Sequence, residues 1–206
     1  MIDLSGRVVI VTGGNSGIGL GIARGVARAG ASVAIWSRRQ QRNAEAVAEL
    51  ERLGAAAIGV QCDVSDEGNV VGAMRETLDR FGRLDCLVAN AGTIGKQSFT
   101  DMSLGEWHRV LQVNLDGAFL CLREAARVLV GQGQGGSLVG VSSTSAIDGA
   151  PGQQHYAASK TAAGSVHGYQ RAADNPGPAP ATGRGTPYGQ GRPWGFPGWT
   201  SGTNQG

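Results

Sequence analysis

Short apolar runs alternate with longer stretches of helical spacing along most of the chain. RVVIVT at 7–12 is rich in β-branched residues, whereas GIGLGIARGVARAG at 17–30 carries apolar residues at helical spacing. The pattern recurs, with further strands predicted at 32–36, 56–62, 84–90 and 136–143 and helices at 40–54, 67–82, 103–130 and from Gln154 onward. Because parallel strands need long crossover connections, this alternation predicts a doubly wound α/β fold with helices on both faces of a parallel sheet.

The last part of the chain has a different composition. After Val166 there is no Val, Ile, Leu or Met, and 15 of the 35 residues from Ala172 to Gly206 are Gly or Pro. Such a segment cannot bury enough apolar area to offset its ordering. The composition therefore predicts a folded domain at 1–170 and a Gly/Pro-rich, disordered tail at 171–206.

Charge and cysteine content narrow the class of protein. The net charge is only +2 and the charges are interspersed, so no basic stripe indicates a nucleic-acid partner. Cys62, Cys86 and Cys121 lack metal-ligand spacing, and we expect them to be buried thiols in a reducing compartment. The apolar run near the N-terminus is too short for a signal peptide or a membrane span, so we expect a cytoplasmic protein with neither metal nor membrane contact.

The clearest candidate for ligand binding is TGGNSGIG at 12–19, which joins the first strand to the first helix. Gly13, Gly17 and Gly19 permit a tight turn and let the backbone and the helix N–H groups approach a pyrophosphate. The alternative is a purely structural turn. In this fold ligands bind at the carboxyl ends of the strands, so the motif at the end of the first strand favours a dinucleotide site.

The end of the second strand bears on which dinucleotide binds. An acidic residue there would meet a free ribose 2′-hydroxyl, but the chain has Ser37, Arg38 and Arg39. A guanidinium favours a 2′-phosphate, so we expect NADP(H) to be preferred over NAD(H), although a solvated basic helix start would look the same. Asp63 and Val64, after the third strand, are candidates to meet the adenine, unless Asp63 only begins the next turn.

The candidate for proton transfer is YAASK. Tyr156 and Lys160 are separated by one helical turn, and a nearby ammonium stabilises a phenolate, whose reference pKa is ~10. Such a tyrosine can exchange a proton with a carbonyl or alcohol oxygen. Ser143, at the end of the fifth strand, could bond the same oxygen, with Ser142 and Ser145 as competitors.

Taken together, TGGNSGIG, the NAG at 90–92, Asn114, Ser143 and YAASK resemble the short-chain dehydrogenase/reductase family over about residues 5–170. The resemblance implies a Rossmann-like fold with Tyr156 as acid/base, Ser143 polarising the carbonyl, Lys160 binding the nicotinamide ribose and lowering the Tyr pKa, and Asn114, at the start of the longer helix, ordering a water. The implied cofactor-binding residues are Gly13, Asn15, Ser16, Gly17, Ile18, Gly19, Ser37, Arg38, Asp63, Val64, Asn90, Ala91, Gly92, Tyr156 and Lys160.

The resemblance implies an enzyme that interconverts a secondary alcohol and a ketone, acts on a small molecule and forms a homo-oligomer. The chain departs from the family after the YxxxK helix, where the expected C-terminal strands have no counterpart. We expect that departure to leave the edge of the fifth strand and the inner face of two helices uncovered. The alternatives are a catalytically compromised dinucleotide-binding protein and an unstable fragment without a substrate lid. His108, His155 and His167 have neither a partner at triad spacing nor a metal pattern, so we interpret them as surface or structural residues.

Overall fold

The computed structural model describes residues 2–173, and its centre is a parallel sheet of five strands. The strands are β1 (Val8–Thr12), β2 (Ser32–Ser37), β3 (Ala57–Gln61), β4 (Cys86–Ala89) and β5 (Ser137–Gly140), in the spatial order β3-β2-β1-β4-β5. The doubly wound α/β prediction is confirmed. Because the order reverses direction between β1 and β4, a crevice opens at the carboxyl ends of these two strands.

The central strands are apolar along their whole length because both faces of the sheet are covered. All five residues of β1 are buried, as expected for a strand in the middle of a parallel sheet. Thr12 is level with Trp36 on β2, and Val11 is level with Val88 on β4. This register brings the loops after β1, β2 and β4 to one edge of the sheet.

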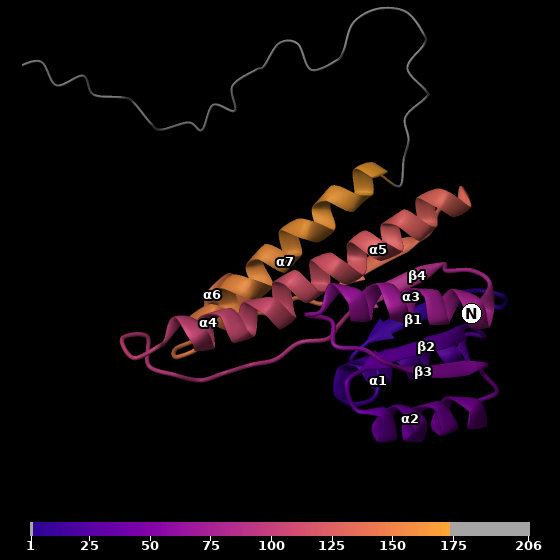
Figure 1. The fold of residues 1–206 in the computed structure, drawn as a ribbon, viewed down its shortest axis with the longest axis horizontal. Coiled ribbons are helices and arrows are strands. Elements are labelled where there is room, and N and C mark those ends of the chain that lie inside the picture. Colours follow the sequence, from indigo (N-terminus) through magenta and orange to yellow (C-terminus); the bar gives the residue numbers. More distant parts are fainter. Residues whose placement is uncertain (1, 174–206) are drawn as a thin grey trace, which may run out of the picture. The chain divides into compact units, whose positions relative to one another are not determined.

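The helices form two layers, one on each face (Figure 1). On one face α1 (Gly17–Arg28) and α2 (Gln40–Arg52) cover an apolar cluster that includes Val11, Val33 and Ile35. The other face carries α3 (Glu67–Phe81), α5 (Gly117–Gln132) and α7 (Gln154–Ala173), which contact its strands. α4 (Leu104–Leu111) packs against α7, and a short α6 (Ser145–Asp148) precedes α7. α7 continues three residues past the predicted domain boundary at 170, and most of the predicted tail lies outside the described residues.

The two helical stretches predicted within 103–130 follow one another without a break in the helical backbone. A π-helical turn, η1 (Gln112–Asp116), joins α4 to α5, and the backbone stays helical at both junctions, Leu111 and Asp116. Asn114 therefore lies inside this π turn, and the expectation that it opens the longer helix is wrong. A π turn widens the helix locally and often occurs at functional sites.

In the described residues β5 is an edge strand, and an apolar hollow of about 630 Å³ opens beside α1. Its apolar lining comes from β1, α1, β4 and β5 and includes Val9, Ile22, Val26, Cys86, Val88 and Val139. Among the described residues, an apolar surface is thus open on the α1 side of β4 and β5, beside the edge strand that the sequence predicted to be uncovered. Within 2–173, no helix combines the length and the apolarity needed to cross a membrane.

Candidate functional site

In the glycine turn after β1, the start of α1 packs directly against the turn backbone and the Asn90 side chain. Gly13 has φ +64°, and a Cβ on Gly19 would lie 2.5 Å from Asn90 Nδ2 and still closer to the Gly13 carbonyl, so position 19 excludes any side chain. Gly17 has φ +52° and faces open space. The Ser16 side chain makes no capping bond, and the first turn of α1 has no acidic residue. The helix N–H groups are therefore left for an anionic ligand.

Thr12 holds the ends of β1 and β4 together behind this turn. Its buried hydroxyl accepts hydrogen bonds from the backbone N–H of Asn90 at 3.0 Å and of Ala91 at 2.9 Å. The Asn90 side chain donates to the Thr12 carbonyl at 2.9 Å. The Asn90 side chain thus fixes the crevice wall, and it is not free to donate that same hydrogen to a ligand.

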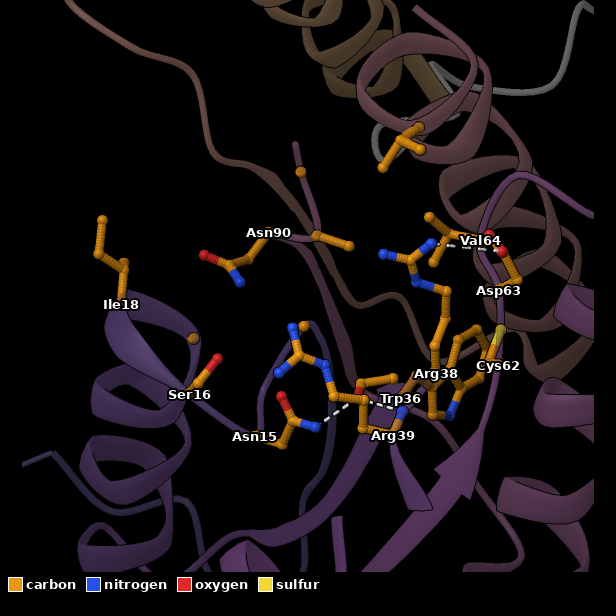
Figure 2. Close-up of a pocket in the computed structure, with 16 residues that line it drawn as sticks. Asn15, Ser16, Ile18, Trp36, Arg38, Arg39, Cys62, Asp63, Val64 and Asn90 are labelled. Carbon is orange, nitrogen blue, oxygen red and sulfur yellow. Dashed lines mark hydrogen bonds and ion pairs between the residues drawn. The ribbon is translucent and has the colours of Figure 1, made fainter. Parts of the chain in front are cut away.

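A pocket of about 280 Å³ lies at the carboxyl ends of β1, β2, β3 and β4 (Figure 2). Twelve of the residues that line it belong to the predicted cofactor-binding set: Gly13, Asn15, Ser16, Ile18, Gly19, Ser37, Arg38, Asp63, Val64, Asn90, Ala91 and Gly92. The other three members of that set, Gly17, Tyr156 and Lys160, do not line it. The rim at 16–19 is the α1 N-terminus, so the pocket combines an anion-binding end with a basic end.

The basic end of the pocket is formed by the loop after β2. Arg38 extends toward Asp63, with the two charged groups 3.9 Å apart and the Arg38 side chain 67% exposed, while Arg39 points toward Asn15 (Figure 2). An ion pair this open to water is weak. The guanidinium groups of Arg38 and Arg39 can therefore turn toward an anion in the pocket at little cost.

Asn43, on α2, holds the residues at the basic end of the pocket in place. The sequence did not indicate this role. Its buried side chain donates to the carbonyls of Ser37 at 3.1 Å and Val60 at 3.0 Å, and it accepts from Asn15 at 2.9 Å. Four further residues line the pocket outside the predicted cofactor-binding set: Trp36, Arg39, Cys62 and Val113. Three of them adjoin predicted positions, but Val113 comes from the π turn, which no sequence pattern indicated.

Lys160 is drawn inward from α7 toward the ends of β4 and β5. Its side chain is buried, and its Nζ donates to the Val141 carbonyl at 2.8 Å. Burial lowers the pKa of Lys160, because desolvation penalises the charged form. The Nζ lies 6.0 Å from the centroid of the Tyr156 ring, close enough for the ammonium to act electrostatically on the phenol.

Asn114 ties three segments of the chain together from the π turn. Its side chain accepts from Thr93 N at 2.7 Å and donates to Thr93 O at 2.9 Å and to Ser159 Oγ at 3.0 Å. The Ser159 hydroxyl in turn donates to the Tyr156 carbonyl at 2.7 Å. Asn114 therefore links the loop after β4 to the helix that carries Tyr156 and Lys160.

The serines after β5 take different positions. Ser142 donates to the Lys160 carbonyl at 3.0 Å, so its proton serves to hold α7. Ser143 Oγ accepts from Ser145 N at 3.2 Å and engages no acceptor within the described residues. A hydroxyl has one proton to donate, and that of Ser143 is therefore available for a substrate oxygen.

Gly92 connects the pocket to the residues predicted to act in catalysis. It lines the pocket, and a Cβ built on it would lie 3.2 Å from Asn114 Oδ1 and 3.5 Å from Lys160 Nζ. The structure thus brings Asn114 and Lys160 to one end of the pocket, with Tyr156 next to Lys160. Among the described residues, Ser143 and Tyr156 make no hydrogen bond to each other.

Comparison with known proteins agrees with the family resemblance found in the sequence. The chain matches the family model of the short chain dehydrogenases over residues 7–173, which is more than half of its length. It is 41% identical over 158 residues to an L-rhamnose 1-dehydrogenase (NAD(P)(+)) of a Sphingomonas species, covering 76% of this chain and 62% of that protein. It is 35% identical over 161 residues to a 3-oxoacyl-[acyl-carrier-protein] reductase of Synechocystis, covering 78% of this chain and 65% of that protein.

Solved structures agree at the level of the fold. A short-chain type dehydrogenase/reductase from Mycobacterium marinum has a TM-score of 0.78 and 34% sequence identity, over 80% of this chain and 66% of that one. An NAD+-bound xylitol dehydrogenase has a TM-score of 0.76 and 30% identity, over 79% of this chain and 63% of that one. The chain therefore spans somewhat less than two thirds of the length of the curated relatives it matches.

Proposed function

Because the chain belongs to the short-chain dehydrogenase/reductase family, we propose that it is an NAD(P)(H)-dependent oxidoreductase that interconverts a secondary alcohol and a ketone. The observation that carries the proposal is the convergence at Gly92. The pocket at the carboxyl ends of the strands reaches Gly92, which lies close to the buried Lys160 ammonium, and the Tyr156 phenol lies next to that ammonium. Binding of the cofactor and proton transfer to the substrate would then occur side by side.

The pocket fits a dinucleotide by its shape and its charges. Gly13 and Gly19 leave no room for side chains where the backbone must approach a pyrophosphate, and Gly17 faces open space at the N-terminus of α1. Asp63 and Val64 line the end where an adenine would lie, beside Arg38. When bound, the nicotinamide supplies or accepts the hydride.

In this proposal the chain itself handles the proton. Tyr156 donates a proton to the ketone oxygen during reduction and takes it back during oxidation, and the Ser143 hydroxyl donates a hydrogen bond to the same oxygen. The Lys160 ammonium stabilises the phenolate form of Tyr156, and it would also hold the nicotinamide ribose of a bound cofactor. Asn114 holds the loop after β4 against α7, and in this proposal it also orders a water in the proton relay.

The test of the activity is a screen for turnover with a matched pair of variants. Wild type is assayed with NADPH or NADH and a panel of ketones, aldoses and 3-oxoacyl thioesters, alongside Tyr156→Phe and the distant control Arg42→Ala, whose side chain is exposed on α2. We expect turnover in wild type and the control, and a loss of at least about a hundredfold in Tyr156→Phe.

Direct binding separates the alternatives. NADPH is titrated into wild type while nicotinamide fluorescence and thermal unfolding are followed, since a bound ligand raises the unfolding temperature. Saturable binding without turnover on any substrate would contradict the enzymatic proposal and favour a dinucleotide-binding protein. No binding and no cooperative unfolding would favour an unstable fragment.

We also propose that NADP(H) is preferred, because Arg38 and Arg39 line the end of the pocket that would hold the adenosine ribose. Charge-assisted bonds to a 2′-phosphate would be lost in the double variant Arg38→Ala/Arg39→Ala, so its Kd for NADPH should rise about tenfold or more while its Kd for NADH changes little. Arg42→Ala should change neither. Equal weakening of both cofactors would contradict the preference.

The proposal also covers the substrate class and the oligomeric state. The partner is a small alcohol or ketone, and the functional form is a homo-oligomer. In support of assembly, α5 exposes two large apolar side chains, with Phe119 45% and Val130 71% exposed. Sedimentation of the full chain measures this, and a monomer at micromolar concentration would contradict it.

A further inference from the structure

Next to Tyr156 lies a charged cluster that the proposed reaction does not use. His155 is fully buried, and its Nε2 lies 3.3 Å from Glu106 Oε1 on α4. Glu106 also accepts two hydrogen bonds from Arg109, at 2.7 and 2.8 Å. Sequence spacing could not indicate this group because Glu106 and His155 are 49 positions apart. We call Glu106, Arg109 and His155 the His155 cluster.

The hydrogen-bond roles within the cluster follow from the charge of Glu106. The bonds from Arg109, with a further contribution from His155, lower the pKa of Glu106 to about 2, so its carboxylate is ionised near neutral pH. An ionised carboxylate only accepts hydrogen bonds, and His155 Nε2 must therefore carry the donated hydrogen. His155 Nδ1 is then buried without a partner among the described residues, which costs free energy.

The position of Glu106 shows that this arrangement replaces a more ordinary one. Ser103 caps α4 by accepting from Glu106 N at 3.1 Å, and a glutamate at that place normally bonds back to the start of its own helix. Here the carboxylate is directed toward Arg109 and His155 instead. The Ser103 cap is thus kept, but the Glu106 carboxylate contacts the first turn of α7 instead of completing the cap.

The cluster also holds the loop after β4. Arg109 donates to Thr93 Oγ1 at 3.1 Å and to the Ile94 carbonyl at 3.3 Å. A Cβ on Gly95 would lie 2.7 Å from His155 Nε2 and closer still to Glu106 Oε1, so the backbone of this loop is packed directly on the cluster. The loop therefore rests on groups supplied by both α4 and α7.

We propose that His155 is a positioning residue that, through Glu106 and Arg109, fixes the loop at 93–97 relative to the first turn of α7, where Tyr156 is the next residue. The loop follows Gly92 directly, so the same tether sets the distance between the end of the cofactor pocket and the Tyr156 phenol. The role in the reaction rests on the proposed function, whereas the tether itself does not.

The first test measures the tether without any need for activity. Amide hydrogen exchange is followed in His155→Ala, in the conservative His155→Gln, and in the control His108→Ala, whose side chain is exposed on the same helix as Glu106. We expect exchange at 93–97 and 153–157 to quicken about tenfold in His155→Ala, with exchange at 8–20 unchanged. His155→Gln, which can still donate to Glu106, should restore slow exchange, and the control should match wild type.

Two results would overturn the proposal. One is unchanged exchange at 93–97 in His155→Ala. The other is faster exchange across the whole sheet that His155→Gln fails to reverse, which would mean only a general loss of stability. A glycine pair gives an independent check: Gly95→Ala should also loosen 93–97 because its Cβ meets the cluster, whereas Gly105→Ala, with its nearest neighbour at 3.7 Å, should not.

The second test separates positioning from the proposed function. With a substrate from the screen, His155→Ala should lower kcat about tenfold and leave the Kd for the dinucleotide within about twofold, with partial recovery in His155→Gln. An unchanged kcat would overturn the positioning role. If wild type turns over no substrate, the proposed function fails, while the exchange experiment still decides whether His155 holds the loop.

Discussion

At the scale of single residues, Lys160 brings a charge into the interior. It is 5% exposed, and its one described hydrogen-bond acceptor is the Val141 carbonyl. Desolvation lowers its pKa in the folded state, so the folded protein binds this proton less tightly than the unfolded chain does. Folding stability should therefore increase with pH between the lowered pKa and the ordinary value near ~10.4.

Replacing Lys160 should separate stability from function. In Lys160→Met the cost of burying the ammonium is absent, so at neutral pH the variant should unfold at the same or a higher urea concentration than wild type. Turnover should fall at least about a hundredfold because the phenolate of Tyr156 loses its nearby cation. Urea unfolding and steady-state kinetics check the two effects, and a variant that is both active and less stable would contradict the assignment.

Glu106 gives a pH dependence of the same sign, but in the acid range. Its pKa is lowered, first by the hydrogen bonds from Arg109, from an ordinary value of 4.5 to about 2. As pH falls below the unfolded value, the unfolded chain takes up this proton before the folded protein does, so the stabilisation is complete above about 4.5 and is lost toward about 2.

The variant Glu106→Gln isolates that contribution. Wild type should be the more stable of the two at pH 6, and the difference in free energy of unfolding should shrink as the pH is lowered from about 4.5 toward 2. Urea titrations of both proteins at several pH values measure the difference. A gap that stays constant with pH would mean that the carboxylate is not the stabilising group.

At the scale of elements, two glycines of α1 differ in whether packing requires them. Gly19 is buried against the Gly13 carbonyl and the Asn90 side chain, whereas a Cβ on Gly21 would meet nothing within 4 Å. Gly19 is thus required by the approach of the helix to the crevice. Gly21 only lowers the helix propensity of an exposed position.

These two positions make a matched pair of substitutions. Gly19→Ala should destabilise the protein by about 2–4 kcal/mol and abolish dinucleotide binding, since the overlap is with backbone that cannot move aside. Gly21→Ala should stabilise it by about 0.5–1 kcal/mol and leave binding unchanged. Thermal unfolding and NADPH titration measure both. Equal effects at the two positions would contradict the packing described for Gly19.

The π turn illustrates an element that sequence could not predict. The apolar spacing through 103–130 is that of ordinary helices, and nothing in it marks one extra residue in the turn at Gln112–Asp116. Within the turn, Asn114 bonds to Thr93 and Ser159, which come from distant parts of the chain. A local pattern carries no information about such partners.

At the scale of the whole molecule, the burial of the three thiols shows how well the helices and the sheet shield the core from solvent. Cys62 and Cys121 are each 1% exposed, and burial raises the pKa of both thiols. Cys86 lines the hollow beside α1, and burial together with the charge of Asp85 raises its pKa to about 11. All three are therefore poorly ionised at neutral pH.

The reactivity of the three thiols should follow their exposure and their pKa, with Cys86 reacting before Cys62 and Cys121. At about pH 8, Cys86 should react with an aromatic disulfide about a hundredfold more slowly than a free cysteine, because little of it is thiolate. Cys62 and Cys121 should react only as the protein unfolds, and three thiols should be counted in denaturant. The variant Cys86→Ser should remove the earlier phase. Three fast thiols in the native protein would show that the sheet is not closed over its core.

The sequence by itself determined the doubly wound fold, the family, and most of the residues around the cofactor pocket. This follows from local physics, since the strand and helix periods alternate plainly and the carboxyl ends of parallel strands always meet at one edge. TGGNSGIG and the residues after β2, β3 and β4 could therefore be placed together from their positions alone. Roles of individual side chains at that edge, such as those of Arg38 and Tyr156, remain predictions.

Only the tertiary structure decided which side chains meet across long separations. It assigned the Asn90 amide to Thr12, placed Asn114 in a π turn, set Val113 in the lining of the pocket, and bonded Asn43 to Asn15 and Ser37 of that lining. It also gave His155 its partner Glu106. These contacts depend on how helices from separate crossovers pack, and because packing joins residues with no local pattern in common, no spacing along the chain could have indicated them.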